Sequence, residues 1–204
     1  MAQITHGVRA VLSHPLVYST LQSLMGAHSF RKSFVENYVK PFSGMRILDI
    51  GCGPADILAY LPQVSYSGFD ISQDYIDQAR KRFGPLGEFH CKHLSVEDLE
   101  GLPPFDVVFA LGLIHHLEDD EAVGVMQLAL HALKPGGRLL TIDPCWEPSQ
   151  NPLARLLIRG DRGQNVRDKV GYEVLAKVVF EAPRVAVKHR AWIPYTHCFM
   201  ECQR

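Results

Sequence analysis

Two acids and two glycines surround the end of one short apolar run in this chain of 204 residues. Asp49 lies inside the run, Gly51 and Gly53 form a G-x-G motif directly after it, and Asp70 follows 19 residues past Gly51. Glycines at the end of a strand let a ligand approach the backbone where side chains would collide. A buried carboxylate needs a cationic or hydrogen-bonding partner, and an acid about 20 residues farther on is where ribose hydroxyls are bound. This spacing predicts a nucleoside-binding site.

Each acid also has a structural interpretation. Asp49 can be a buried structural carboxylate, and Asp70 can cap a helix that begins near Ser72. Taken singly, each structural interpretation explains its residue as well as a role in ligand binding does. Taken together, the two structural interpretations explain the spacing of Asp49 and Asp70 less well than a shared binding site does. The third glycine of the dinucleotide fingerprint G-x-G-x-x-G is replaced by Asp56. A carboxylate at the start of a helix would repel a pyrophosphate there, so the sequence disfavours a dinucleotide.

The pair His115-His116 follows an apolar run at 105–111. Side chains after a parallel strand lie at the edge of the sheet where ligands bind, and an imidazole titrates near neutral pH. His115 is therefore the candidate catalytic residue, as a general base. The favoured alternative is that both histidines are packing or capping residues. No set of histidines and carboxylates has metal-ligand spacing, so no metal is expected.

Three arginines, Arg155, Arg159 and Arg162, are spaced four and then three residues apart. They share one face if a helix persists to Arg162. On one hypothesis they bind an anionic substrate group, carboxylate or phosphate, through bidentate hydrogen bonds. The alternative, slightly favoured, is a solvated face paired with Asp161 and Asp168.

The elements that would position these groups alternate along the chain. Alternating strands and helices of this length imply a parallel sheet with helices on both faces. A tight link near Ile193-Pro194 suits an antiparallel hairpin at the end. We expect strands at 45–50, 66–71, 88–93, 105–111, 138–142, 184–192 and 196–201, and helices at 13–40 (interrupted at Gly26), 56–61, 73–83 and 119–133, with a short acidic helix or turn at 96–99.

Composition narrows the class of protein. The net charge of −1, from 21 basic and 22 acidic residues, does not provide the positive field typical of nucleic-acid binding. The first residues lack the order of a signal peptide, and no apolar run approaches membrane-spanning length. Five scattered cysteines without C-x-x-C spacing are typical of reduced thiols. We therefore expect a cytoplasmic protein that acts on a small molecule.

Four motifs in order resemble those of the class I S-adenosylmethionine-dependent methyltransferases, specifically the small-molecule type 11/12 branch that includes quinone-biosynthesis enzymes. They are ILDIGCGPAD, YSGFDIS, FDVVFALGLIHHLED and LKPGGRLLTIDP, which lie between Gly44 and Pro144. The resemblance implies a Rossmann-like α/β fold with a seven-stranded, mostly parallel sheet, as a single domain over residues 1–204. Residues 1–43 would form a helical lid and residues 44–204 the core.

The resemblance also implies roles for single residues in binding S-adenosylmethionine. Asp49, Gly51 and Gly53 would line the methionine and ribose portion, and Asp70 would bind the ribose hydroxyls. The remaining positions are Ile71 on the adenine face, Ser95 and Val96 at the adenine edge, and Ala110 at the methionine end. The chain departs from the family at Ala55, in place of a glycine, and at Ser95, where the family often has an acid.

The expected activity is methyl transfer to a small-molecule or lipid-like acceptor, with an anionic group as one option. Two rivals remain open: a non-catalytic protein that binds S-adenosylmethionine, and an NAD-dependent oxidoreductase. The atom that is methylated, the acceptor and the oligomeric state do not follow from the sequence.

Overall fold

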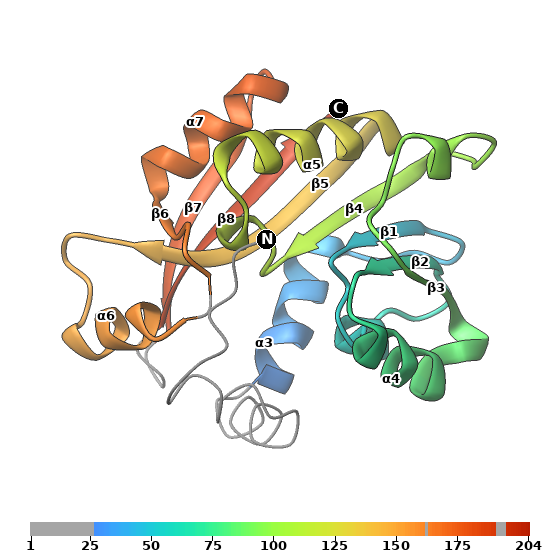
Figure 1. Cartoon of the computed structure of the whole chain (residues 1–204), viewed down its shortest axis with the longest axis horizontal. Helices are drawn as coiled ribbons and strands as arrows, with labels where there is room; N and C mark the ends of the chain where they lie inside the picture. Colours follow the sequence, from blue (N-terminus) through green and yellow to red (C-terminus); the bar gives the residue numbers. More distant parts are fainter. Residues whose placement is uncertain (1–26, 162, 191–194) are drawn as a thin grey trace.

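A computed structural model describes residues 27–161, 163–190 and 195–204, and all structural statements below concern those residues. One central sheet runs through the molecule with the strand order β3-β2-β1-β4-β5-β8-β7 (Figure 1). Its strands are β1 (Arg46–Ile50), β2 (Ser65–Asp70), β3 (Gly87–Cys91), β4 (Phe105–Leu111), β5 (Leu133–Trp146), β7 (Arg184–Arg190) and β8 (Tyr195–Gln203).

The pairing of these strands confirms the predicted sheet. The pairs β1–β2, β1–β4, β2–β3 and β4–β5 are parallel, whereas β8 pairs antiparallel with both β5 and β7. A two-residue strand, β6 (Arg167–Asp168), adds to the end of β5 beside this seven-stranded path. The carboxyl ends of β1, β2, β4 and β5 therefore meet at one edge, where the loops that bind ligands in open α/β sheets lie.

Helices cover both faces, as expected (Figure 1). The helical elements are α3 (Ala27–Phe34), η1 (Val35–Val39), η2 (Asp56–Tyr60), α4 (Gln73–Phe83), η3 (Gly84–Leu86), η4 (Glu97–Leu99), η5 (Ile114–His116), α5 (Asp119–Ala132), α6 (Pro152–Arg159) and α7 (Lys169–Val179). One buried apolar cluster joins α5 and α7 to the sheet, and a second joins α3, η1, η2 and α4 to the opposite face. Burial of these two clusters supplies the main driving force for folding.

Three elements differ from the sequence predictions. The helical stretch expected at 56–61 is present as η2, but it is a 3-10 helix that ends at Tyr60. The fifth strand is longer than expected because it pairs with both β4 and β8. Helix α7 was not expected, although its N-cap Asp168 accepts a hydrogen bond from the amide of Gly171. Of the predicted N-terminal lid, residues 1–26 lie outside the described part.

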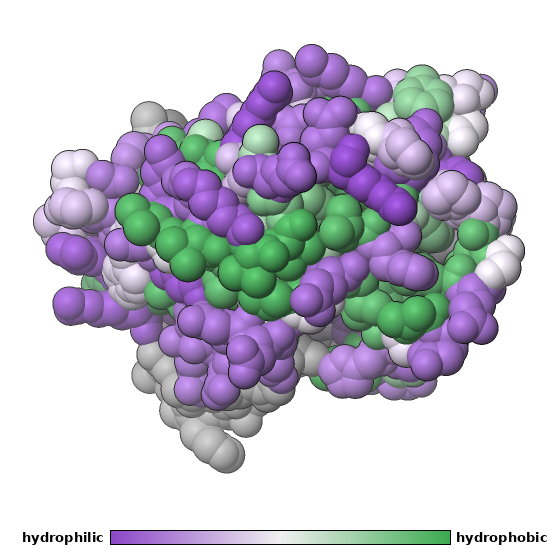
Figure 2. Space-filling view, turned by 90° about the horizontal axis from the view of Figure 1, so that it is seen from above, coloured by the Kyte–Doolittle hydropathy of each residue, from purple (hydrophilic) through white to green (hydrophobic). Residues whose placement is uncertain are grey.

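The outer face of α7 is apolar. Val170, Val174 and Val178 recur every fourth residue and are mostly exposed. Figure 2, a view onto the side of α5 and α7, shows a band of hydrophobic side chains across that face. A search of the described helices found no segment with the length and hydropathy needed to cross a membrane.

Candidate functional site

The loop after β1 has the backbone conformation that its glycines allow. Gly51 and Gly53 adopt φ values of 73° and 53°, in the left-handed region that favours glycine. A Cβ at Gly51 would lie 3.1 Å from the side chain of Leu113, whereas a Cβ at Gly53 would meet open space. Ala55 adopts φ 55°, which is strained for a residue with a side chain. The loop thus leaves an open approach to the backbone beside Gly53.

Asp49 is a buried acid with one unsatisfied oxygen. Its side chain is on β1, and the hydroxyl of Tyr66 on β2 donates to its Oδ2 over 2.6 Å. Its Oδ1 is buried and has no hydrogen-bond partner among the described residues. Burial raises the pKa of Asp49 to about 7; the bond from Tyr66 lowers it and the nearby charge of Asp70 raises it. A carboxyl group in this state lacks a cationic partner.

Asp70 connects the glycine loop to the loop after β2. Its Oδ2 accepts from the amide of Gly53 over 2.9 Å, and its Oδ1 accepts from the amide of Ser72 over 2.8 Å. The N-cap of α4 is Ser72, whose hydroxyl accepts from the amide of Tyr75. The structure therefore places Asp70 beside Gly53, and each of its oxygens keeps a second lone pair for another donor.

Apolar side chains line the same edge farther along. Ile71 and Val96 are 49% and 45% exposed, which is unusual for large hydrophobic residues next to strand ends.

The amide and hydroxyl of Ser95 both donate to Oδ2 of Asp98, so Asp98 rather than a ligand fixes Ser95. Ala110 is buried near the end of β4. The role of Asp98 was missed, although it lies only three residues after Ser95.

Asp56 does not have the effect on a dinucleotide that the sequence predicts, because its charge is paired. Asp56 does not present an isolated negative charge, because Arg31 and Arg82 pair with its carboxylate over 2.9 and 2.5 Å. The element that begins there is the short 3-10 helix η2. An α-helix N-terminus, which usually holds a pyrophosphate, is therefore not present after this glycine loop.

His115 lies between two carboxylates. Its ring is 4% exposed, with Nδ1 2.9 Å from Oδ1 of Asp143 and Nε2 3.2 Å from Oδ1 of Asp161. Tyr195 donates to the other oxygen of Asp161 over 2.9 Å. Burial alone would lower the pKa of His115, but hydrogen bonds to the two acids outweigh it and raise the pKa to about 9.

This geometry favours the packing role, which was the preferred alternative for His115, over the role of general base. An imidazole that is already protonated at neutral pH, with both nitrogens facing carboxylates, has no lone pair to accept a proton. The ring of His116 lies 4.0 Å from that of His115, measured between centroids. His115, His116 and Asp161 each have an atom that could bind a metal ion, and these atoms lie within 4.8 Å of one another. The spacing of these residues in the sequence did not reveal this grouping. The hydrogen bonds with Asp143 and Asp161 already provide a partner for each ring nitrogen of His115.

The predicted arginine face is only partly described. Arg155 and Arg159 are exposed on α6, which ends at Arg159, and Arg162 lies outside the described residues. Arg167 has a structural role: its guanidinium donates to the carbonyls of Ile114, Asn165 and Leu117 and to the carboxylate of Asp119. Of the predicted face, the structure thus describes only Arg155 and Arg159, which lie one turn apart on α6.

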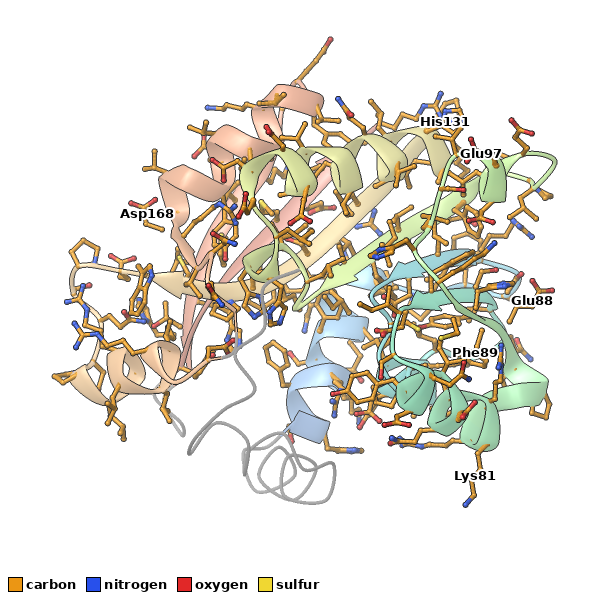
Figure 3. All side chains as sticks on the ribbon, viewed as in Figure 1. Lys81, Glu88, Phe89, Glu97, His131 and Asp168 are labelled. Atoms are coloured by element: carbon orange, nitrogen blue, oxygen red, sulfur yellow. The ribbon has the colours of Figure 1, made fainter. Side chains whose placement is uncertain are left out.

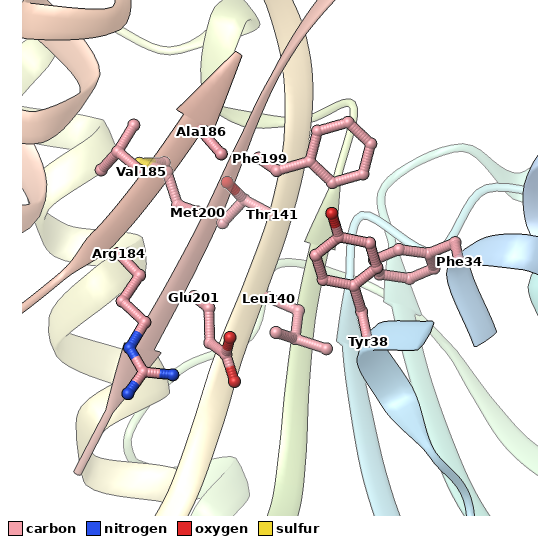
Figure 4. A pocket seen from close by; sticks show the side chains of 10 residues that line it. All are labelled: Phe34, Tyr38, Leu140, Thr141, Arg184, Val185, Ala186, Phe199, Met200 and Glu201. Atoms are coloured by element: carbon pink, nitrogen blue, oxygen red, sulfur yellow. The ribbon is translucent and has the colours of Figure 1, made fainter. Parts of the chain in front are cut away.

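A cavity of about 200 Å³ lies elsewhere, between η1 and the strands β5, β8 and β7. Figure 4 shows Phe34, Tyr38 and Phe199 along one side of it and Arg184 and Glu201 along another. It contains none of the residues predicted to bind the cofactor. The candidate site is instead the edge formed by the loops after β1, β2 and β4.

Comparison with known proteins decides the family. A family model described as "Methyltransferase domain" matches residues 48–139, which include the glycine loop, Asp70 and the end of β4. This chain carries a class I methyltransferase domain. An O-methyltransferase, cnsE of Penicillium expansum, is 31% identical over 157 residues, which are 67% of this chain and 55% of that protein. A tRNA U34 carboxymethyltransferase of Pseudoalteromonas translucida is 28% identical over 156 residues, 74% of this chain and 44% of that protein.

Solved structures agree on the fold. The structure of the plantazolicin methyltransferase BamL in complex with a desmethylPZN analog and SAH has a TM-score of 0.66 and 13% identity; the match covers 95% of this chain and 92% of that one. The methyltransferase domain here spans about half the length of the curated relatives it matches. Its cofactor is S-adenosylmethionine, and the site fits: the unsatisfied Oδ1 of Asp49 suits a cationic ammonium, and the open side of Gly53 suits a close approach.

Proposed function

We propose that this protein transfers the methyl group of S-adenosylmethionine to an oxygen atom of a small-molecule acceptor. One observation carries the proposal: an unsatisfied buried carboxylate, Asp49, lies beside a left-handed glycine loop that is closed by Asp70. A zwitterionic amino acid joined to a nucleoside supplies a cation for Asp49 and ribose hydroxyls for Asp70.

In this proposal each predicted residue has one task. Asp49 binds the ammonium of the methionine portion, and Gly51 and Gly53 let that portion approach the backbone. Asp70 accepts from the ribose hydroxyls with the lone pairs that Gly53 and Ser72 leave. The other predicted contacts lie toward the two ends of the cofactor: Ile71 and Val96 on the faces of adenine, the hydroxyl oxygen of Ser95 at the adenine amino group, and Ala110 near the sulfonium.

The reaction itself asks little of the protein beyond alignment. The bound cofactor supplies a sulfonium, an intrinsically good leaving group, so proximity and orientation provide much of the rate. A base is needed only when the acceptor must lose a proton. The protein's contribution is to hold both reactants at the carboxyl edge and to exclude water.

The choice of oxygen and of a small molecule rests on two supports. The fungal relative is named an O-methyltransferase. The net charge of −1 gives no general attraction to nucleic acid, although the second relative is named for tRNA. We also propose that Arg155 and Arg159, which are exposed on α6, contact an anionic group of the acceptor. Cytoplasmic location remains a prediction of the sequence, as does the single-domain organisation.

The test has two parts. Calorimetry with S-adenosylhomocysteine, S-adenosylmethionine and NADH should show binding of the first two only. Release of S-adenosylhomocysteine is then measured with a panel of phenols, catechols, aliphatic alcohols, amines and a tRNA transcript. Turnover with a hydroxyl compound supports the proposal, and turnover only with an amine or with tRNA contradicts the acceptor class. Tight binding without turnover on the whole panel favours the non-catalytic rival, and preferential binding of NADH would overturn the cofactor assignment.

A further inference from the structure

The segment between α6 and α7 is fastened to the turn that follows β4. Its amide at Asn165 donates to the carbonyl of His115 over 2.9 Å, and Asp161 faces the His115 ring. Gly163 donates its amide to Oδ1 of Asp161 over 2.8 Å. Arg167 closes the other end through the carbonyls of Ile114 and Leu117. These contacts join the described residues of 160–168 to the edge where the cofactor loops end.

His115 is central to the hydrogen bonds that hold this segment. Asp143, on β5, accepts from the backbone amide of His115 and also faces its Nδ1, so the ring cannot rotate without losing a bond. Asp161, beyond α6, holds the opposite nitrogen and is itself held by Tyr195 on β8. One imidazole thus links β5, the 160–168 segment and β8. Removal of one member of such a buried charge network leaves its partners without compensation, so the three groups hold one another in a fixed arrangement.

Gly163 packs closely against the ring and the carbonyl oxygen of His115. A Cβ added to Gly163 would lie 2.1 Å from Cδ2 of His115 and 2.8 Å from its carbonyl oxygen. Real Cβ atoms do not approach other atoms that closely, so only glycine fits against the ring. The absence of a side chain at Gly163 is therefore required by the contact, not by its backbone conformation.

We propose that His115 is a positioning residue: held between Asp143 and Asp161, it fixes residues 160–161 and 163–168 as a rigid wall on the acceptor side of the methyl-transfer site. The assignment of this wall to the acceptor side rests on the proposed function, whereas the hydrogen bonds that hold the segment do not. The wall lies across the turn after β4, whereas the predicted cofactor contacts lie in the loops after β1, β2 and β3 and at the end of β4. Loosening it should affect the acceptor and spare the cofactor.

The test compares three variants with the parent protein loaded with S-adenosylhomocysteine. His115→Gln removes the cation, Gly163→Ala wedges the segment away and keeps every charge, and His131→Gln is the matched control. His131 is exposed near the end of α5, far from the network (Figure 3). Hydrogen exchange is measured at the amides of Gly163 and Asn165, with amides of β1 as the internal reference.

We expect the first two variants to exchange at Gly163 and Asn165 at least about tenfold faster than the parent, with β1 unchanged. The dissociation constant for S-adenosylhomocysteine should stay within about twofold. With any hydroxyl compound that turns over in the acceptor panel, the apparent KM should rise about tenfold or more, with kcat changed much less. His131→Gln should match the parent in all measurements.

Three results would overturn the proposal. Unchanged exchange in both variants would show that the network does not hold the segment. Parallel loss of S-adenosylhomocysteine binding would assign His115 to the cofactor site, and a fall in kcat at constant KM would make it a participant in the chemistry. If the panel shows no turnover, the proposed function fails, but faster exchange with intact cofactor binding would still establish the fastening.

Discussion

The raised pKa of Asp49 predicts how cofactor binding depends on pH. The free carboxyl group has a pKa of about 7 because it is buried, and the ammonium of the cofactor binds its ionised form. Below that pKa, part of the protein must lose a proton before it can bind. If only the ionised form binds, the dissociation constant should rise about eightfold between about pH 7.5 and pH 6, which is about 1.2 kcal/mol.

Two variants separate this cause from general acid damage. Asp49→Asn should remove the pH dependence and weaken binding at pH 7.5 by about 2 kcal/mol, because an amide does not neutralise the ammonium. Tyr66→Phe removes the hydrogen bond that lowers the pKa of Asp49. Its pH dependence should therefore move to higher pH, so that binding is already weaker at pH 7.5.

The assay is calorimetric titration with S-adenosylhomocysteine across this pH range, with thermal unfolding as a check on the fold. Asp77→Asn, at an exposed acid on α4, is the matched control and should follow the parent. A dissociation constant that is flat from pH 7.5 to 6, together with parental affinity in Asp49→Asn, would refute the reasoning. Asp49 would then be only a structural acid bonded to Tyr66.

The remaining predictions concern the other parts of the site. Asp70→Ala should weaken S-adenosylhomocysteine binding by about 3 kcal/mol in calorimetry, because it leaves both the ribose hydroxyls and the Gly53 amide without an acceptor; parental affinity would exclude the ribose role. The pKa of His115, about 9 in the folded protein against 6.5, adds roughly 3 kcal/mol of stability that is complete below pH 6.5 and lost as pH rises through about 9. Urea unfolding should show this loss in the parent and not in His115→Gln. Arg159→Ala should raise the KM of an anionic acceptor and leave cofactor affinity unchanged; a neutral true acceptor contradicts it.

Local sequence determined the strands and the cofactor loop. Short apolar runs bounded by glycine, proline and acids specify buried parallel strands, whereas the order of these strands in the sheet, with β4 next to β1, was decided by the tertiary structure. The positions of Gly51, Gly53 and Asp70 were readable because they lie directly after those strands. The helix α7 was missed because its exposed valines blur the contrast between its two faces.

Only the tertiary structure decided the state of the ionisable groups. The sequence presented Asp56 as a bare charge, but Arg31 and Arg82 come from helices on either side of it. It left His115 open between a general base and the favoured packing role, and it gave no sign that Asp143 and Asp161, 28 and 46 residues farther along, enclose its ring. A pKa depends on burial and on charges within a few ångströms, and both are set by residues far apart in the chain. Residue type and spacing therefore identified the cofactor edge, while packing assigned each charged group its partner.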